Sequence, residues 1–463
     1  MKIINFGSLN IDRVYDVAHS VQPGETISSP AMHTFAGGKG LNQSVAASRA
    51  GGQVVHAGAV GADGDFLMNI LEKAGVDLSV LMRVQQPSGH AIIQVEPAGQ
   101  NAIIVYGGAN HCLTQEYIDR VLDTAQPDDL ILLQNEVSHV AEIIQSAADR
   151  GLRVVWNPSP FPENLECFPL DKVYLFIVNE LEAARLAGGS PSMTAEQLLD
   201  ALSEKYPHSN FVLTMGSHGV ICRLEKACCS HPAYQVQAVD TTGAGDTFCG
   251  YFLTGLCQQQ ALADCLKSAS AAAAIAVSRA GAAPSIPTRD EVEVFLFLPA
   301  AKRLGLIYSS SEVNSQIQAD QAKAHAASLG LTVVERTVSS VNDIQQAAES
   351  MVGQVDFIYV PTDNVIASSI PTLVKVTDPA KIPVFVGADS MAKDGALGSL
   401  SVDFYKSGIQ AGHMAADVLD GKIKTQDTAV EDPEVLEVII NKKSVETLGL
   451  TIPDEYKNAK MVG

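Results

Sequence analysis

The chain has 463 residues, 46% of them hydrophobic, which is enough for about two or three folded domains with substantial cores. Its formal net charge of −21 predicts an acidic surface that repels phosphate backbones. Nucleic acid is therefore excluded as an expected partner, whereas a single nucleotide is not. The longest apolar run, at 268–277, is alanine-rich and too short to span a bilayer, so no membrane partner is expected.

The first seven residues run into a strand-like sequence without the charged-then-apolar pattern of a signal segment. We therefore expect a cytoplasmic location. In a reducing compartment the eight cysteines are expected to be free thiols. A zinc site is an alternative for one cluster, although the cluster lacks the CxxC spacing of structural zinc sites. Its members are Cys222, Cys228, Cys229 and His231.

Residues 3–6 predict a short apolar strand, and Asn10 and Asp12 follow its carboxyl end, where α/β sheets bind ligands. Ordinary turn chemistry is the alternative for both residues. A glycine-rich segment then begins a small-residue helix, in which Lys39 and Asn42 face the same way on the first turn. Because no Ser or Thr follows the lysine, a Walker phosphate loop is excluded. Two interpretations of this segment remain: a site that hydrogen-bonds sugar hydroxyls, or a plain glycine-rich helix start.

Two β-rich runs at 90–95 and 101–106 are joined by a turn sequence at 96–100, which is typical of a hairpin. Together with residues 14–33 they predict a small sheet standing off the main domain. Such a sheet is suited to act as a lid that excludes water from phosphoryl transfer. An ordinary edge hairpin is the alternative.

From residue 129 onward, strand and helix patterns alternate, which predicts an α/β fold with a doubly wound, mostly parallel sheet. The expected strands are 130–133, 152–156, 173–178, 211–215 and 219–224, and a helix is expected at 140–150. Polar residues follow the predicted strand ends, where such a sheet places its site. They are Glu136, Asn157, Asn179, Glu182, Thr214 and Ser217.

The most specific stretch is 240–248, Asp-Thr-Thr-Gly-Ala-Gly-Asp-Thr-Phe, between a strand-like run at 234–239 and a predicted helix at 248–256. A glycine turn at a helix N-terminus presents free N–H groups to an anion such as phosphate. Asp246 places a carboxylate at this anion site. That combination favours a base that takes a proton from a hydroxyl while the N–H groups hold the charge of a transferring phosphoryl group. A tight turn before an ordinary helix is the alternative.

These nine residues, with the segments at 37–43, 179–183 and 214–219, resemble the signatures of the phosphofructokinase-B, or ribokinase-like, sugar kinases. The resemblance covers residues 1–296 and is strongest to ribokinases. It implies that Asp246 is the catalytic base and that Gly243, Ala244 and Gly245 form the anion hole. It also implies that Asp246 contacts the sugar together with Asn10, Asp12, Gly38, Lys39, Asn42 and Glu136.

The same resemblance implies ATP, Mg²⁺ and K⁺ as cofactors. Asn179 and Glu182 would organise Mg²⁺ and the phosphates, and Gly245 would contact the nucleotide together with Thr214, Gly216, Ser217 and Gly219. Potassium would shape the anion hole from a loop site bound largely through backbone carbonyls. Its positions are Asp240, Thr242, Ala276, Arg279, Gly281 and Ser285. Relatives commonly pair through the lid, about 10–40 and 88–110 here, which implies a homodimer.

After a junction at 297–302, residues 303–463 resemble one lobe, the C-terminal one, of the substrate-binding proteins of ABC importers. The resemblance rests on 307–315, 359–364 and 382–385. Candidate ligand contacts are Ser309, Ser311, Thr362, Asp363 and Asp389, with helix capping as the alternative. Because the other lobe is absent, the segment 400–421 is expected to expose apolar surface. A sensor domain and a fusion remnant both fit this lobe, so its ligand or partner stays open.

The expected function is ATP-dependent phosphorylation of D-ribose to D-ribose 5-phosphate. Two alternatives remain open. One is a kinase of another sugar or of a nucleoside, because departures such as Leu41 and Gln100 leave the sugar undecided. The other is a small-molecule binding protein in which the C-terminal lobe is the functional part.

Overall fold

The computed structural model describes residues 1–97, 100–190, 192–297, 301–328, 331–402, 404–420, 422–423, 436–452, 456 and 459–463. The chain divides into two compact units, Met1–Leu296 and Phe297–Gly463. Two residues of the predicted hairpin turn, 98–99, lie outside the described residues, as do 298–300 of the predicted junction.

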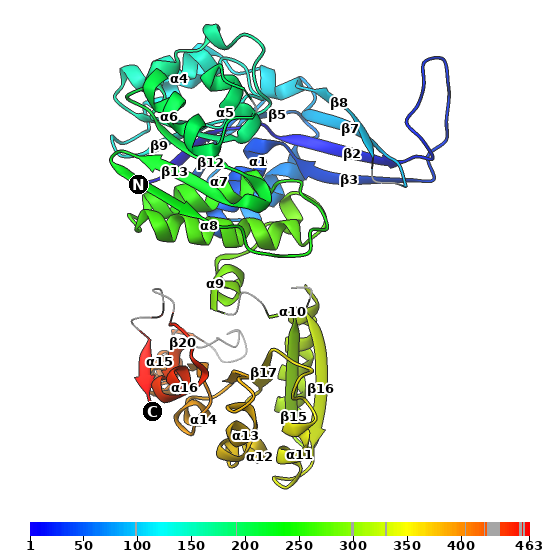
Figure 1. The fold of residues 1–463 in the computed structure, drawn as a ribbon, viewed down its shortest axis with the longest axis vertical. Helices are drawn as coiled ribbons and strands as arrows, with labels where there is room; N and C mark the ends of the chain where they lie inside the picture. Colours follow the sequence, from blue (N-terminus) through cyan, green and yellow to red (C-terminus); the bar gives the residue numbers. More distant parts are fainter. Residues whose placement is uncertain are drawn as a thin grey trace. The chain divides into compact units, whose positions relative to one another are not determined.

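The first unit is built on an eight-stranded sheet with the order β14-β13-β12-β11-β10-β9-β1-β4 (Figure 1). Six of its strands are parallel, and β13 and β14 form an antiparallel edge. This arrangement confirms the predicted doubly wound, mostly parallel sheet. The strands are β1 (Ile3–Phe6), β4 (Val54–Ala57), β9 (Leu130–Leu133), β10 (Arg153–Trp156), β11 (Leu175–Asn179), β12 (Asn210–Thr214), β13 (Val220–Leu224) and β14 (Ala227–His231).

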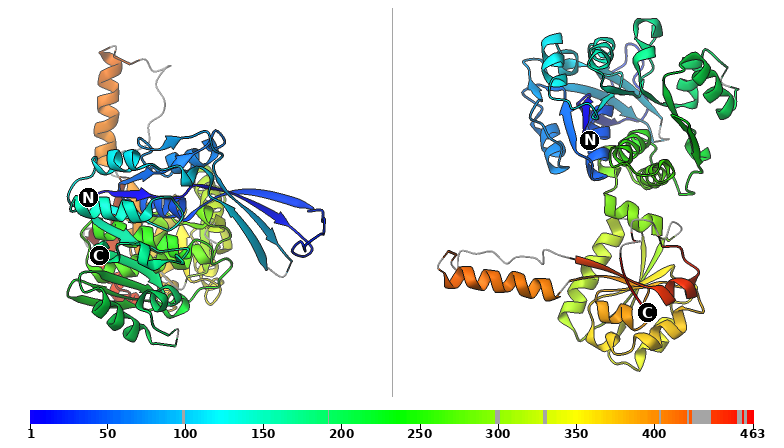
Figure 2. Two further views of the ribbon diagram at one scale, coloured as in Figure 1. Left: turned by 90° about the horizontal axis from the view of Figure 1, so that it is seen from above. Right: turned by 90° about the vertical axis from the view of Figure 1, so that its left-hand side faces the viewer.

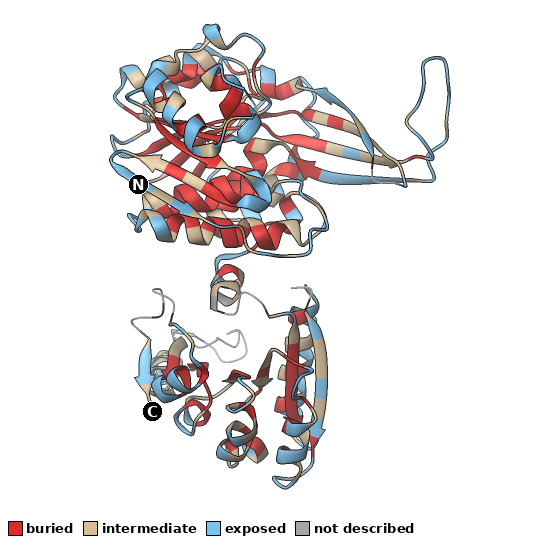
Figure 3. Ribbon diagram, viewed as in Figure 1, coloured by how far each residue is buried: buried red, intermediate tan, exposed pale blue. Residues whose placement is uncertain are grey.

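Helices cover both faces of this sheet because its strands are apolar on both sides (Figure 3). In β1, Ile3 belongs to one core and its neighbour Ile4 to the other, as the alternation of a strand requires. The first core is covered by α1 (Lys39–Arg49), α2 (Asp65–Lys73), α7 (Ala244–Cys257), α8 (Leu262–Val277) and part of α9 (Arg289–Phe297). The second is covered by α3 (Gln115–Leu122), α4 (Val140–Asp149), α5 (Glu180–Ala187) and α6 (Ala195–Lys205).

The predicted lid is a four-stranded sheet that extends away from the body of the first unit (Figures 1 and 2). Its order is β3 (Ala31–Gly37), β2 (Asn10–Asp16), β7 (Gly89–Val95) and β8 (Asn101–Tyr106). Strands β2 and β7 run parallel, and the outer strands β3 and β8 are antiparallel to them. Two further short strands, β5 (Ala59–Val60) and β6 (Met82–Arg83), pair with each other.

One predicted strand was wrong. Residues 234–239 contain no strand, although their alternation of apolar and polar residues suggested one. The sheet already ends at β14, and the following segment instead packs beside α9, where the ring of Tyr234 meets that of Phe295 at 5.1 Å. The segment then joins the end of α8 through a hydrogen bond from Val239 N to Val277 O of 2.7 Å. An extended chain packed on one side produces the same alternation as a strand.

The longest apolar run of the sequence lies in α8, which is a packed core helix with Ala269, Ala272 and Ala276 fully buried. No helix in the described part of the chain has the length and apolar character needed to cross a bilayer. All eight cysteines are free thiols, as predicted.

The second unit contains a seven-stranded sheet with the order β16-β15-β17-β18-β19-β20-β21. The first five strands of that order are parallel, and β20 is antiparallel to β19. The strands are β15 (Arg303–Ser309), β16 (Thr332–Val338), β17 (Phe357–Val360), β18 (Val384–Val386), β19 (Gly398–Val402), β20 (Leu436–Asn441) and β21 (Lys460–Val462). Its helices are α10 (Val313–Ser328), α11 (Asp343–Glu349), α12 (Asn364–Ala367), α13 (Ile370–Thr377), α14 (Asp389–Lys393), α15 (Phe404–Leu419) and α16 (Lys442–Leu448).

Candidate active site

Asp246 lies in the first turn of α7 and is only 5% exposed. Both carboxylate oxygens accept hydrogen bonds from amides of α1, which packs against α7. Asn42 Nδ2 donates to Oδ2 at 3.0 Å, and Gln43 Nε2 donates to Oδ1 at 2.9 Å. The carboxylate is therefore held in one orientation by two neutral donors.

The N-terminus of α7 presents backbone N–H groups to open space. Gly243 precedes the helix with φ 75°, a left-handed conformation that favours glycine. The N–H groups of Gly245 and Asp246 lie in the first turn, where a helix provides no acceptor for them. A Cβ added at Gly245 would meet no atom within 4 Å, so an anion can approach the N–H groups there. The helix start thus places N–H groups that an anion could reach beside a buried carboxylate.

Glu136 lies just after β9, and its carboxylate contacts the start of α1. Its Oε2 accepts the backbone N–H of Lys39 at 2.9 Å and the hydroxyl of Ser8. Burial raises the pKa of Glu136, and these hydrogen bonds oppose the rise. The carboxylate of Asp246 has the largest influence on Lys39 and raises the pKa of its ammonium group, against the effect of burial. Carboxylates and an ammonium group thus face the same space beyond the strand ends.

Asp12 lies on the lid strand β2 beside Gly37, where an added Cβ would come within 1.9 Å of Asp12 Oδ2. Burial, and then the charge of Glu136, raises the pKa of Asp12 from 3.8 to about 7. Gly38 has φ 93°, a conformation that favours glycine, and because it has no side chain its backbone can lie next to Ser8.

Asn10 is buried at the start of β2, and its Oδ1 accepts a hydrogen bond from Asn110 Nδ2 at 2.8 Å. Asn110 belongs to the short 3-10 helix Gly108–His111 that follows the lid, and its Oδ1 accepts the N–H of Leu9 at 2.9 Å. In Asn42 the Oδ1 atom is buried and has no hydrogen-bond partner within the described residues. A hydroxyl-bearing ligand would supply the missing donor.

The predicted nucleotide residues lie at the ends of β11 and β12. Asn179 and Glu182 form a capping box at α5: Asn179 Oδ1 accepts Glu182 N at 2.9 Å, and Glu182 Oε2 accepts Asn179 N at 3.0 Å. Thr214 Oγ1 donates to Val178 O at 3.4 Å, and exposed Ser217 lies in the following turn. Gly216 and Gly219, also in this loop, have φ 53° and 96°.

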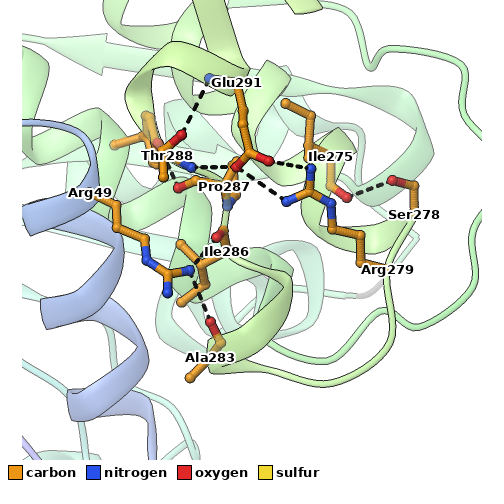
Figure 4. A network of polar contacts seen from close by, with 10 residues as sticks. Arg49, Ile275, Ser278, Arg279, Ala283, Ile286, Pro287, Thr288 and Glu291 are labelled. Atoms are coloured by element: carbon orange, nitrogen blue, oxygen red, sulfur yellow. Dashed lines mark hydrogen bonds and ion pairs between the residues drawn. The ribbon is translucent and has the colours of Figure 1, made fainter. Parts of the chain in front are cut away.

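The predicted cation residues lie in two adjoining loops. Asp240 accepts the N–H groups of Thr242 and Gly281, both at 2.9 Å, and these bonds lower its pKa against the raising effect of burial. Arg279 is ion-paired with Glu291 of α9 at 2.9 Å (Figure 4). Ala276 lies in the last turn of α8. Ser285 is buried and donates to Ala282 O at 2.8 Å.

The zinc alternative has no geometric support. Cys222 pairs with Cys229 across β13 and β14, whereas Cys228 pairs with Arg223 and points to the opposite face. Within the described ranges, no three His, Cys, Asp or Glu side chains converge as a metal site.

In the second unit, capping and pairing occupy the candidate ligand contacts. Asp363 is 1% exposed, caps α12 through Ile366 N at 3.0 Å, and accepts Ser309 N at 2.6 Å. The hydroxyls of Ser309 and Ser311 bond each other, Thr362 Oγ1 donates to Gly387 O, and Asp389 pairs with Lys393. Apolar residues of the segment predicted to lack a partner are exposed, namely Leu400, Ile409 and Leu419.

A family model described as pfkB family carbohydrate kinase matches residues 1–289. The chain belongs to this family. It is therefore a sugar kinase. A second family model, described as ABC transporter substrate binding protein, matches residues 278–461. Both resemblances that the sequence motifs suggested are confirmed.

The kinase unit is similar to ribokinase of Haemophilus influenzae, with 34% identity over 297 residues that cover 63% of this chain and 96% of the relative. It is also similar to deoxyribokinase of Salmonella typhi, with 32% identity over 305 residues that cover 64% of this chain and 99% of the relative. The structure of Arabidopsis thaliana ribokinase complexed with ribose and ATP matches with 29% identity and a TM-score of 0.57, covering 64% of this chain and 98% of that one.

The second unit is similar to a tyrosine-binding protein of Clostridioides difficile, with 40% identity over 152 residues. The match covers 33% of this chain and 44% of the relative. The chain therefore spans less than half of that binding protein.

Several residues of the kinase site were not predicted. Gln43 lies inside a recognised motif, but sequence reasoning gave it no role, although it contacts Asp246 directly. Gln134 precedes Glu136 by two positions, a spacing that offered a signal. Asn5, His56 and Asn110 carried none, because their partners are distant in the sequence.

Proposed function

We propose that the chain transfers the γ-phosphoryl group of MgATP to the terminal hydroxymethyl of D-ribose, giving ADP and D-ribose 5-phosphate. The observation that carries the proposal is the buried Asp246 carboxylate, fixed by Asn42 and Gln43 in the first turn of α7, beside N–H groups that face open space. The ribokinase relatives support ribose as the acceptor and ATP as the donor.

In this mechanism Asp246 accepts the proton of the attacking hydroxyl as the oxygen bonds to the γ-phosphorus. The bond between the γ-phosphorus and the β–γ bridging oxygen breaks, and ADP leaves with that oxygen. The N–H groups of Gly243, Ala244 and Gly245 stabilise the charge on the transferring group, and the Ala244 N–H exchanges its 3.3 Å bond to Thr241 O for this one. Because the start of α7 already holds the backbone in place, little reorganisation of the chain is needed during the reaction.

The sugar is oriented by side chains on three sides of Asp246. Asn10 and Asp12 come from the lid strand β2, Lys39 and Asn42 from the start of α1, and Glu136 from the end of β9. The unpartnered Oδ1 of Asn42 accepts a sugar hydroxyl. Gly38 leaves room for the ring. Carboxylates, amides and an ammonium group together match a polyhydroxyl substrate with both donors and acceptors.

The nucleotide lies along Thr214, Gly216, Ser217 and Gly219, with its phosphates toward Gly245. Glu182 and Asn179, in the α5 capping box, would organise Mg²⁺ beside these phosphates, largely through water. When bound, Mg²⁺ neutralises charge on the phosphates. Since the Glu182 bond to Asn179 N uses only Oε2, the other oxygen of Glu182 is available to a water ligand.

The loops around Asp240 fit a potassium ion. Because its pKa is lowered, the Asp240 carboxylate carries a negative charge. The nearby positive charge of Arg279 is neutralised by Glu291. The ion would be held mainly by carbonyl oxygens at the positions Asp240, Thr242, Ala276, Arg279, Gly281 and Ser285. Bound there, it would stabilise the loop that shapes the anion hole.

In this proposal the lid closes over the sugar. The same lid pairs two copies of the chain into a homodimer, and the enzyme acts in the cytoplasm. Exposed apolar side chains on β8 support this pairing: Ile103, Ile104, Val105 and Tyr106 are 53%, 63%, 63% and 49% exposed.

A second candidate acceptor is 2-deoxyribose, which the deoxyribokinase relative favours. A binding or sensing role of the second unit is a separate candidate, favoured by its similarity to the tyrosine-binding protein. Thermal stabilisation of the full-length chain by L-tyrosine, without any sugar, would support that role.

The test measures ADP release from MgATP with D-ribose, 2-deoxy-D-ribose, D-fructose, adenosine or no acceptor, each in K⁺ or Na⁺. The proposal predicts the highest kcat/KM with ribose and activation by K⁺. A higher kcat/KM with another acceptor would overturn the ribose assignment. Equal rates in K⁺ and Na⁺ would overturn the cation assignment alone.

A further inference from the structure

A continuous chain of buried hydrogen bonds leads from Asp246 to the loop after β1. Its successive bonds are 2.9, 2.7, 2.9, 2.8, 2.8 and 3.1 Å long. Beyond Asp246 itself, its side chains come from β1, α1, β4 and the end of β9, and each of these is at most 1% exposed. In order, the chain runs from Asp246 through Gln43, Gln134, Asn5, Ser44 and His56 to the carbonyl of Gly7.

The direction of these bonds is fixed from the Asp246 end. A carboxylate only accepts, so the Nε2 of Gln43 must face Asp246 and its Oε1 must face Gln134. Gln134 Nε2 then donates both to that Oε1 and to Asn5 Oδ1. Asn5 consequently turns its Nδ2 toward Ser44 Oγ and the carbonyl of Gly40, both at 2.8 Å.

The direction is fixed independently from the other end. Burial lowers the pKa of His56 to about 4, so its ring is neutral and carries one N–H. The Gly7 carbonyl only accepts, which places that hydrogen on Nε2 and leaves Nδ1 as an acceptor. The hydroxyl of Ser44 must therefore donate to Nδ1 while its oxygen accepts from Asn5. The two derivations agree at Ser44.

Neighbouring bonds lock Gln43 further. Its second N–H donates to Asn157 Oδ1 at 3.0 Å, and Asn157 Nδ2 donates to the Ile177 carbonyl at 2.8 Å, so neither amide can flip without losing partners. A flipped Gln43 would also direct an oxygen at the Asp246 carboxylate. The orientation of the donor to Asp246 thus depends on amides that never touch it.

We infer that Gln43 and Gln134 are positioning residues for the base: Gln43 fixes Asp246 Oδ1, and Gln134 fixes the orientation of Gln43. The inference rests on the proposed role of Asp246. Gln134 Oε1 is buried without a hydrogen-bond partner within the described residues, which costs stability. That cost argues that Gln134 is retained for its donor group. Through Asn5 and Gly40 the same network also ties the base to the first turn of α1, which carries the proposed sugar contacts Lys39 and Asn42.

The test replaces each glutamine by Met, which keeps the side-chain length and removes the donors. Gln134→Met is expected to lower kcat about tenfold and Gln43→Met about a hundredfold, since a misplacement of about 1 Å costs on the order of 10² in rate. The sugar KM should stay within about twofold in both. Asn210→Leu removes another buried amide of the same sheet, bonded to Tyr174 O, and should leave kcat unchanged.

The double variant separates positioning from general destabilisation. If Gln134 acts only through Gln43, adding Gln134→Met to Gln43→Met should lower kcat by less than about twofold further. Assays use the acceptor with the highest kcat/KM, so an error in the sugar assignment does not affect the result. A kcat of Gln134→Met within about twofold of the wild type, or independent losses in the double variant, would overturn the inference.

Discussion

Replacement of Asp12 by Asn is expected to stabilise the kinase unit at neutral pH while weakening sugar binding. The Asp12 carboxyl is buried against Gly37 and lies near the charge of Glu136; burial first, and then that charge, disfavour its ionised form and raise its pKa to about 7. The substituted amide would keep the shape of the side chain and remove its charge. A residue whose main role is to bind a substrate commonly costs stability in this way.

The magnitude follows from the pKa. A folded pKa raised from 3.8 to about 7 means that wild-type stability is fully present below about pH 4 and is lost as the pH rises through 7. About three pKa units at 1.36 kcal/mol each give a ceiling of about 4 kcal/mol. Solvent screening at the edge of the lid reduces this to about 2 kcal/mol, or roughly 4–8 °C in Tm.

The assay compares the Tm of Asp12→Asn and wild type between about pH 5 and about pH 8. The variant should gain Tm relative to wild type as the pH rises and level off above 7. Asp200→Asn removes a carboxylate whose side chain is 71% exposed and whose partner, Arg223, stays charged across this pH range, so this control should show no such trend. A Tm difference that is independent of pH, or a loss of stability at about pH 8, would refute the reasoning. In wild type, sugar affinity should rise with pH through about 7, because the ionised carboxylate accepts hydroxyl hydrogens.

Three further predictions follow from the site and the lid. Asp246→Asn should lower kcat by about 10²–10⁴-fold, measured as ADP release, with sugar affinity by calorimetry within about twofold; unchanged turnover would contradict the base assignment. Glu291→Gln removes the charge that neutralises Arg279, so the K⁺ concentration for half-maximal activation should rise about tenfold, equivalent to about 1.4 kcal/mol of repulsion. An unchanged K⁺ titration would show that this ion pair does not influence the cation site. Ile104→Asp should convert dimers to monomers by light scattering, while Leu181→Asp, equally exposed on α5, should not; dimers that persist would place the interface elsewhere.

The sequence predicted those parts of the site that lie in short contiguous strings. Lys39, Asn42 and Asp246 stand in glycine-rich segments, and the resemblance of these segments to family motifs implies their roles. Gln134 directly follows the apolar strand β9 and Asn5 lies within β1; Gln134 bonds Gln43, 91 residues away, and Asn5, 129 residues away. Local patterns carry no information on such pairs. They became visible only once the sheet order placed β1 beside β9.

Residues with two possible roles were also undecided by sequence. Asn179 and Glu182 satisfy the start of α5, and Asp363 satisfies the start of α12, so helix capping explains these side chains without a ligand. The strand predicted at 234–239 failed for a related reason, because alternation reports one-sided packing and not sheet pairing. Local sequence determines the conformation of such segments better than it determines their partners.

The position of β1 has a consequence for synthesis of the protein. This strand precedes both of its partners in the chain: it pairs with β4 on one side and with β9, some 127 residues later, on the other. Asp246, the proposed base, follows still later, in α7. A nascent chain therefore carries an unpaired apolar strand for much of its synthesis, and the proposed site is assembled late, so its ligands would not stabilise the early intermediates. Helper proteins that shield exposed strands would act in that interval.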